Sequence, residues 1–141
     1  MTLMRACWVS EAVSSGTLAV PALHETLAEV AETIATWDTY VVRSGGRLVG
    51  SVRGRVEPDG AGGRHWNIGR LCVAPDLQGR GLGRVLLEHI ERVAPAEATS
   101  YWLFTGANSA RNQRIYRKAG FRLRPDLASP PGTVVLTKPR G

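Results

Sequence analysis

A glycine-rich turn between an apolar run and a helical pattern is the feature that most restricts how this chain folds. The apolar run at 68–73 is typical of a buried strand. The loop that follows, 75–83, has glycine at every second position from Gly79 onward. Apolar residues then recur at helical spacing from Leu82 until Pro95 ends the pattern. The sequence therefore predicts a strand that passes through a glycine-rich turn into the N-terminus of a helix.

This turn is suited to bind an anion. The first turn of a helix leaves backbone N–H groups unpaired, and the helix dipole favours negative charge at that end. Glycine lets a phosphate approach the backbone closely, and Arg80 and Arg84 add positive charge. The glycine spacing fits neither the dinucleotide-binding fingerprint nor a Walker A loop. We therefore predict a phosphate or pyrophosphate ligand, with a strand–helix connection that binds nothing as the alternative.

The length and the cysteine content restrict the class of protein. A chain of 141 residues predicts one domain, over 1–141. No apolar run approaches the roughly 20 residues of a membrane span, so no membrane partner is expected. Cys7 and Cys72 form no C-x-x-C pair, and they predict neither a disulfide framework nor a metal site. The N-terminus lacks the long apolar core of a signal peptide, so we expect a cytoplasmic location.

The formal net charge of +6 fits two kinds of anionic partner. One is nucleic acid, and the other is a small polyanion. Basic residues gather around the glycine-rich loop, at Arg70, Arg80 and Arg84, and again within 111–118. No stripe alternates basic with aromatic residues, and no nucleic-acid motif is present. The charge pattern therefore favours the small polyanion over nucleic acid.

Helical and strand patterns alternate along the rest of the chain. We expect helices at 3–12, 21–37, 82–93 and 109–119, and strands at 39–43, 48–56, 65–73, 101–104, 121–123 and 133–138. The helical residues expected to face the core are Leu3, Cys7 and Val9, then a stripe of Leu23, Leu27, Val30 and Ile34. The strand at 101–104 is apolar throughout and is expected to be central, whereas 133–138 alternates like an edge strand. Hairpins followed by strand–helix–strand units predict an α/β fold with a mixed sheet.

A second motif lies at 112–121, where Asn112, Tyr116, Gly120 and Phe121 follow the pattern N-x-x-x-Y-x-x-x-G-F. A helix tyrosine by itself usually means packing. Together with Gln78-x-x-Gly81-x-Gly83 after Val73-Ala74-Pro75, however, it closely resembles the two signatures of the GNAT N-acetyltransferase family, in the family's order. The resemblance covers about residues 39 to 138. It implies a central, mostly antiparallel sheet with about four helices.

The resemblance also implies acetyl-CoA as co-substrate, with no metal, and direct attack of an amine on the thioester. The backbone of Leu71, Cys72 and Val73 would pair with the pantetheine arm, if the strand splays from its neighbour at 101–105. Asn112 would hydrogen-bond the same arm. A backbone N–H near Val73 would stabilise the oxyanion. The residues that would hold the pyrophosphate are Gln78, Gly79, Arg80, Gly81, Leu82, Gly83 and Arg84.

Proton transfer is where the sequence departs from part of the family. The resemblance implies that Tyr116 acts as general acid toward the leaving thiolate. Many members carry a glutamate four residues before the position of Leu71, where this chain has Asn67. His65 points to the same face of the strand, and we predict it as the general base, with a surface histidine at a strand end as the alternative. Glu57, Glu11 and water are weaker candidates for the base.

The family usually opens with a strand that is absent or very short here, so we expect six strands at most. The exposed edge would invite pairing with a second copy of the chain as a homodimer. The acceptor is expected to be a small neutral or zwitterionic amine or a peptide amine, because a chain at +6 suits polycationic acceptors poorly. Two alternatives to the enzyme remain, namely an acyl-CoA sensor with a degenerate acceptor site and a basic nucleic-acid-binding module.

Overall fold

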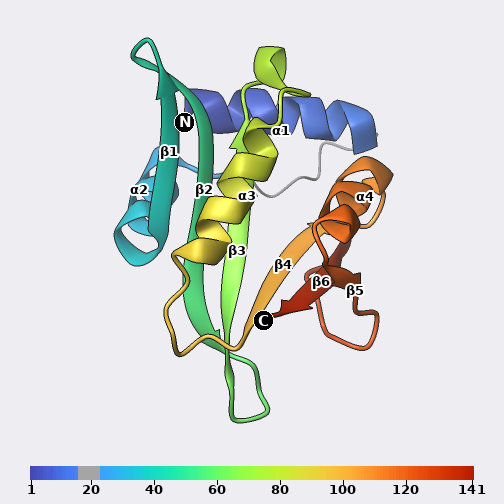
Figure 1. Ribbon diagram of the computed structural model, residues 1–141. Helices are drawn as coiled ribbons and strands as arrows, with labels where there is room; N and C mark the ends of the chain where they lie inside the picture. Colours follow the sequence, from blue (N-terminus) through green and yellow to red (C-terminus); the bar gives the residue numbers. More distant parts are fainter. Residues whose placement is uncertain (16–22) are drawn as a thin grey trace. The chain divides into compact units, whose positions relative to one another are not determined.

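The computed structural model describes residues 1–15 and 23–141, with the side chains at 10–12, 14 and 15 outside the description. The helices are α1 (Thr2–Ser15), α2 (Leu27–Thr36), α3 (Leu82–Arg92), α4 (Ala110–Lys118) and the 3-10 helix η2 (Pro75–Leu77). The strands are β1 (Asp38–Ser44), β2 (Arg47–Pro58), β3 (Arg64–Val73), β4 (Ser100–Gly106), β5 (Arg122–Leu123) and β6 (Thr133–Pro139) (Figure 1). Every predicted helix and strand is present. The predicted start of the second helix at Pro21 lies outside the described residues, and the prediction is wrong for 23–26, since α2 begins at Leu27.

The six strands form a mixed sheet in the order β1-β2-β3-β4-β6-β5. β1 pairs antiparallel with β2, β3 pairs parallel with β4, and β6 pairs antiparallel with both β4 and β5. The predicted fold class, the limit of six strands and the interior position of β4 are confirmed. The prediction of an edge strand at 133–138 is wrong, because the two-residue strand β5 pairs with Leu136 and Thr137 on the outer side of β6.

The chain divides into two compact units, and each is described below by itself. The first consists of residues 1–55 and 70–93, and the second of residues 56–69 and 94–141. Strands β2 and β3 contribute residues to both units. No helix in the described ranges 1–15 and 23–141 is long and apolar enough to cross a membrane.

The core of the first unit lies under α1. Leu3 and Cys7 pack with Val49 of β2 and with Cys72 and Ala74 at the end of β3. The prediction that Val9 faces the core is wrong, since its side chain is 53% exposed. Val9 lies two residues beyond Cys7, which is about 200° around the helix axis and therefore on the opposite face.

The second helix buries fewer of its apolar side chains than the sequence predicts. Thr26 caps α2, and its hydroxyl and the carboxylate of Glu29 form a capping box. Val30 is buried, but Leu27 and Ile34 are 70% and 59% exposed, so the predicted stripe is wrong at these two positions. The reason is the place of α2, which packs on β1 at the edge of the sheet, where few neighbours are available to cover it.

The core of the second unit lies around β4 and β6. Leu103 of β4 is paired with Leu136 of β6, and both side chains are buried together with Phe121 after α4. The guanidinium of Arg140, just after β6, donates hydrogen bonds to the carbonyls of Ala94, Pro95 and Ala98. This places the segment after β6 against the connection that leads into β4.

Candidate active site

The glycine-rich turn of the first unit has the conformation that the sequence predicts. Gly79 and Gly81 have φ of +81° and +80°, a left-handed conformation that a side chain disfavours. Gly81 occupies the N-cap position of α3, where no side chain caps the helix. The backbone donors of the first turn of α3 therefore have no side-chain acceptor at the cap. This is the backbone geometry of an anion site.

Gly83 differs from Gly79 and Gly81 because its φ is not in the left-handed region. A Cβ added to Gly83 would meet only Val73 Cγ2, at 3.8 Å, among the atoms of the chain. Neither backbone conformation nor internal packing requires glycine at this position. A Cβ at this position would occupy space beside the N–H groups of the first turn of α3, where an anion would bind.

The positive side chains around the turn are only partly paired with carboxylates. The guanidinium of Arg84 bonds Glu88 one turn further along α3, at 2.9 Å. Arg80 is exposed in the loop between η2 and α3. The residues of this turn fit a pyrophosphate, because they combine uncapped backbone N–H groups with nearby positive charge.

The loop is fixed to the β1–β2 hairpin by an ion pair. Both guanidinium nitrogens of Arg47 bond the carboxylate of Asp76, at 2.8 and 2.7 Å. Arg47 lowers the pKa of the Asp76 carboxyl, and both side chains are more than half exposed. The pair positions η2 and hence the start of the glycine-rich turn.

The carbonyl of Val73, at the end of β3, accepts hydrogen bonds from two side chains of the same chain. The Cys7 thiol donates to the Val73 carbonyl at 3.1 Å, and the Gln78 side-chain amide donates to the same oxygen at 3.3 Å. Both lone pairs of this carbonyl are therefore engaged. The Val73 carbonyl is therefore occupied within the chain and is not open to a ligand.

Cys72 faces the core of the first unit, so its predicted role is limited to its backbone. Its side chain is 5% exposed, whereas Leu71 and Val73 are half-buried on the alternate face of β3. The hydrogen bond with Cys7, and then burial, raise the pKa of the Cys72 thiol, so it stays protonated.

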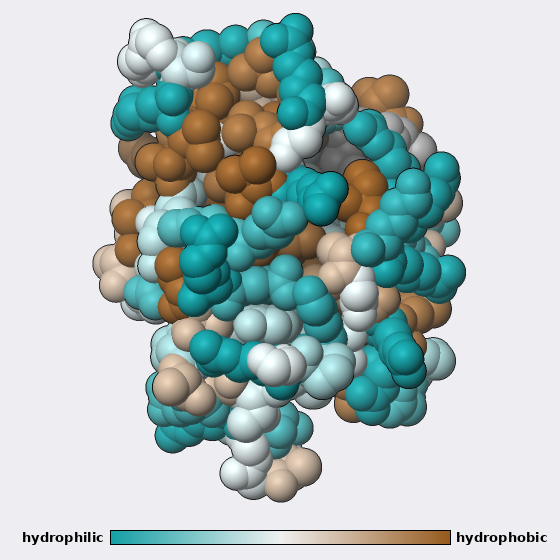
Figure 2. Space-filling model, viewed as in Figure 1, coloured by the Kyte–Doolittle hydropathy of each residue, from teal (hydrophilic) through white to brown (hydrophobic). Residues whose placement is uncertain are grey.

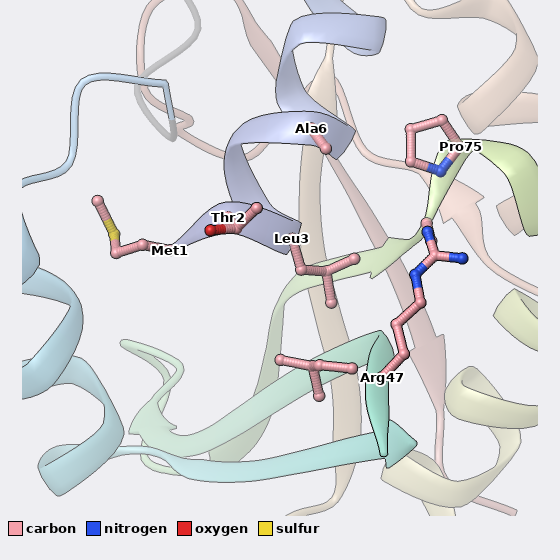
Figure 3. A pocket seen from close by; sticks show the side chains of 8 residues that line it. Met1, Thr2, Leu3, Ala6, Arg47 and Pro75 are labelled. Carbon is pink, nitrogen blue, oxygen red and sulfur yellow. The ribbon is translucent and has the colours of Figure 1, made fainter. Parts of the chain in front are cut away.

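Two hollows open in the first unit. One, of about 410 Å³, lies at the start of α1 beside the β1–β2 turn, and Figure 3 shows Leu3 pointing from α1 toward β2 and Arg47 extending to Pro75. The other, of about 390 Å³, is lined by 42–44, Val49, Leu77, 80–82 and Val85. Figure 2 shows apolar surface on this face, where Figure 1 draws β1 and α3. Three residues of the predicted pyrophosphate loop therefore line the second hollow.

In the second unit, His65 is buried in a polar cluster. Its side chain is stacked on Trp102, with ring centroids 4.0 Å apart and planes 5° apart. Its Nε2 lies 3.6 Å from Glu57 Oε2, and its buried Nδ1 has no hydrogen-bond partner among the described residues. Burial lowers the pKa of His65, although the Glu57 carboxylate opposes this shift, so the imidazole is neutral near pH 7. The alternative of a surface histidine is wrong, since His65 is 5% exposed.

Glu57 connects His65 with Asn67. The Asn67 side-chain amide donates to Glu57 Oε2 at 3.1 Å, the same oxygen that faces His65. Asn67 and His65 are both buried, whereas the Glu57 side chain is 27% exposed. The carboxylate that this chain lacks at Asn67 is therefore supplied beside that residue by the neighbouring strand β2. In the sequence Glu57 is only a weaker candidate for the base, because its position along the chain does not reveal the strand pairing that places it beside His65 and Asn67.

The second motif forms α4 and its C-terminal cap. Asn112 and Tyr116 are both half-buried, and they lie four residues apart on one face of the helix. The N–H of Phe121 bonds the Tyr116 carbonyl, and the N–H of Gly120 bonds that of Arg117, both at 3.0 Å, which is a Schellman motif. Gly120 has φ of +98°, as a residue at this position requires.

The cap places Tyr116 against the hydrophobic residue that follows it. The ring of Phe121, which is buried, meets the Tyr116 ring edge-on, with centroids 6.2 Å apart. At the other end of α4, Ser109 occupies the N-cap position but its side chain makes no cap bond. The Gln113 amide bonds the carbonyls of Gly106 and Ala107 instead and ties α4 to the end of β4.

The predicted residues thus fall into two sets. The first unit brings together the backbone of 71–73 with the turn at 78–84, and the second holds His65 on β3 and the pair Asn112 and Tyr116 on α4. The side chain of Glu11, a weaker candidate for the base, is not described. Within the described part of the chain, no group of three or more His, Cys, Asp or Glu residues is arranged to hold a metal ion.

A model of the GNAT family of acetyltransferases matches residues 8–121. The chain belongs to this family. It is similar to a ribosomal protein bS18-alanine N-acetyltransferase of Salmonella typhimurium, with 40% identity over 52 residues, 36% of this chain and 35% of that relative. It is also similar to an IAA acetyltransferase of Azospirillum brasilense, with 39% identity over 82 residues, 57% of this chain and 52% of that relative. The matched segments thus span about one third and one half of these curated relatives.

Solved structures share the fold. The PaiA N-acetyltransferase of Thermoplasma acidophilum, crystallised with coenzyme A, superimposes with a TM-score of 0.76 at 13% identity, over 99% of this chain and 89% of that chain. The fold that the resemblance implied is thereby confirmed.

Proposed function

We propose that this chain transfers the acetyl group of acetyl-CoA to the amine of a small molecule or peptide. The observation that carries the proposal is the uncapped N-terminus of α3, where Gly79 and Gly81 have left-handed backbones beside Arg80. The family of the chain and the coenzyme A complex of its structural neighbour support acetyl-CoA as the ligand.

The proposed co-substrate site uses the residues predicted for it. The turn from Gln78 to Arg84 holds the pyrophosphate, the strand backbone at 71–73 and Asn112 hold the pantetheine arm, and the N–H of Val73 stabilises the charge that develops on the carbonyl oxygen. Acetyl-CoA supplies the acetyl group as a thioester. Tyr116 donates a proton to the sulfur that leaves, which requires its hydroxyl within hydrogen-bond reach of that atom.

The amine must lose a proton, and we assign this step to the pair of His65 and Glu57. A neutral imidazole is able to accept a proton, and burial keeps His65 neutral near pH 7. His65 is buried, whereas Glu57 is partly exposed and lies 3.6 Å from Nε2. The proton therefore passes through the Glu57 carboxylate, or a water molecule bound to it, to Nε2 of His65, whose own proton lies on Nδ1 in the neutral tautomer that can accept it.

The proposal is tested by binding and then by turnover. At 100 times its Kd, a ligand adds about 2.7 kcal/mol of stability, which raises the melting temperature by several degrees. We expect this rise with acetyl-CoA and a smaller one with the analogue that lacks the 3′-phosphate. Release of free thiol in the presence of an amine panel then measures transfer. Binding without transfer to any amine favours the acyl-CoA sensor, and no binding overturns the proposal.

A further inference from the structure

The first unit contains an arginine cluster that neither the fold nor the proposed chemistry explains. It consists of Arg53 and Arg55 on β2, Arg70 on β3, and the side chains of Trp37 and Glu25 beside them. The guanidinium carbons of Arg53 and Arg55 each lie 4.4 Å from the centroid of the Trp37 ring. Arg70 Nη2 bonds Glu25 Oε1 at 2.7 Å. Arg70 is therefore paired with Glu25, while Arg53 and Arg55 lie over the same indole ring.

The positive charge of this cluster is partly buried. The side chains of Arg70 and Glu25 are 27% and 15% exposed, and Arg53 is half-buried. Burial, followed by repulsion from Arg70, lowers the pKa of Arg53 to about 10. A cation held beside like charges in a half-buried position is destabilised by both effects, and a second anion next to Glu25 would relieve them.

Unpaired polar atoms concentrate at the same place. Four buried side-chain atoms of the cluster and its neighbour Thr39 have no hydrogen-bond partner within 1–15 and 23–141, namely Arg53 Nε, Arg70 Nε, Glu25 Oε2 and Thr39 Oγ1. Thr39 lies directly opposite Arg53 in the β1–β2 ladder. Buried polar groups normally have hydrogen-bond partners. The Nε–H groups of Arg53 and Arg70 are guanidinium donors, which carboxylates commonly accept from.

The backbone of Arg70 is a further unusual feature. Its φ of +49° makes it the one residue other than glycine with a left-handed backbone in the described ranges. Such strain is concentrated at functional sites, where the surrounding structure holds it in place. The left-handed turn breaks the alternation of β3 immediately before Leu71, whose backbone we assign to the pantetheine arm.

We propose that Arg53, Arg55 and Arg70 bind a carboxylate of the acceptor, so that the substrate is an amine that also carries a carboxylate. This inference rests on the proposed acetyl transfer and specifies its acceptor. Along a strand the rise is about 3.3 Å per residue, so the end of β3 at Val73 lies about 10 Å from Arg70. An amino acid or a short peptide spans such a distance, since each residue adds up to about 3.6 Å.

The test compares acceptors that differ only in this charge. The probes are alanine, dialanine and trialanine, each as the free acid and as the C-terminal amide, with acetyl-CoA saturating. We expect at least one free acid to exceed its amide by about 10- to 100-fold in kcat/KM, the range that a charge-assisted hydrogen bond supplies. Equal rates for every acid and amide pair would overturn the proposal. O-Phosphoethanolamine is included, and a preference for it over all the acids would overturn the choice of carboxylate.

Variants assign the effect to the cluster. Arg53→Gln and the exposed Arg55→Gln are each expected to reduce the ratio of acid to amide at least fivefold, through KM, whereas Glu25→Gln removes the competing carboxylate and is expected to raise the ratio. Arg92→Gln on α3 makes the same charge change outside the cluster and serves as the control. If Arg92→Gln lowers the ratio as much, overall charge rather than this site selects the acceptor, and the proposal falls.

A binding measurement separates this proposal from the proposed function. The melting temperature of the coenzyme A-bound protein is measured with the free acids and with the amides, for the wild type and for Arg55→Gln. A rise with an acid, lost in the variant, supports the carboxylate site even if no amine is acetylated, in which case only the enzyme assignment fails. Acetylation without any preference for acids leaves the enzyme assignment intact and overturns the carboxylate site.

Discussion

The imidazole of His65 lies flat against the indole of Trp102, with the ring planes within 5° and the centroids 4.0 Å apart. The stacking closes one face of His65, and the carboxylate of Glu57 lies 3.6 Å from its Nε2. The histidine is therefore fixed in orientation, buried and still in contact with a partly exposed acid. This arrangement allows a proton to move between the surface and a neutral base.

The buried histidine predicts how stability changes with pH. The pKa of His65 is lowered in the folded chain, so the unfolded chain binds more protons between the two pKa values and folding is favoured as the pH rises. This contribution is complete above the ordinary pKa of about 6.5 and is lost as the pH falls below it. Thermal melts from pH 8 to pH 5 should therefore show a steeper loss for wild type than for His65→Gln. Parallel curves would mean that His65 titrates as it does when unfolded.

Glu57→Gln removes the carboxylate and keeps a side chain of the same size. We expect kcat to fall by about 10²- to 10⁴-fold, the usual contribution of a positioned acid or base. Because Glu57 raises the pKa of His65, the acidic limb of the pH–rate profile should also move to lower pH. Glu97→Gln is the matched control, since Glu97 is exposed in the second unit and pairs with Arg64 only at 3.8 Å. An unchanged profile would assign the base elsewhere.

Gly81 and Gly83 are predicted to respond to alanine in opposite ways. Gly81→Ala forces a side chain onto a left-handed backbone and should cost about 1–2 kcal/mol of stability. Gly83→Ala lies inside α3 with an ordinary backbone and a free path for its Cβ, so stability should rise by up to about 1 kcal/mol. Its affinity for acetyl-CoA should nevertheless fall. Denaturant melts and calorimetric titrations measure both quantities, and undiminished affinity in Gly83→Ala would place the ligand away from this turn.

Tyr116→Phe tests the general acid without disturbing the cap of α4. Phenylalanine keeps the edge-on contact with Phe121 and the Schellman bonds, which use the ring and the backbone, so the cap of α4 and the Kd for acetyl-CoA should be retained. We expect kcat to fall by about 10²-fold or more, because the leaving thiolate loses its proton donor. Rates near wild type would show that the tyrosine only packs.

The two motifs could be located from the sequence because their constraints are local. The left-handed glycines at 79, 81 and 120 and the helices that follow or precede them depend on residues a few positions apart. What could not be predicted depends on pairing between strands. The position of β6 inside the sheet follows from the two-residue strand β5, which carries almost no pattern of its own.

The contacts within the polar clusters could not be predicted for the same reason. Glu57 reaches His65 and Asn67 through the β2–β3 hairpin, and Arg53 and Arg70 interact although they lie on different strands. In the sequence Arg53 and Arg70 look like ordinary surface charges, and Glu57 is only a weaker candidate for the base. The exposure of Leu27 and Ile34 has a related origin, since an apolar stripe does not reveal how much of the sheet lies in front of it.

The contacts of Arg140 have a consequence for the order in which the two units fold during synthesis. Every residue of the first unit lies before residue 94, whereas the second unit needs β6 and the guanidinium that closes on the carbonyls of Ala94, Pro95 and Ala98. On the ribosome all residues of the first unit are therefore synthesised before β6, the antiparallel partner of β4, is available. During that interval the apolar β4 is unpaired on its β6 side, and chaperone dependence of the nascent chain should be greatest there.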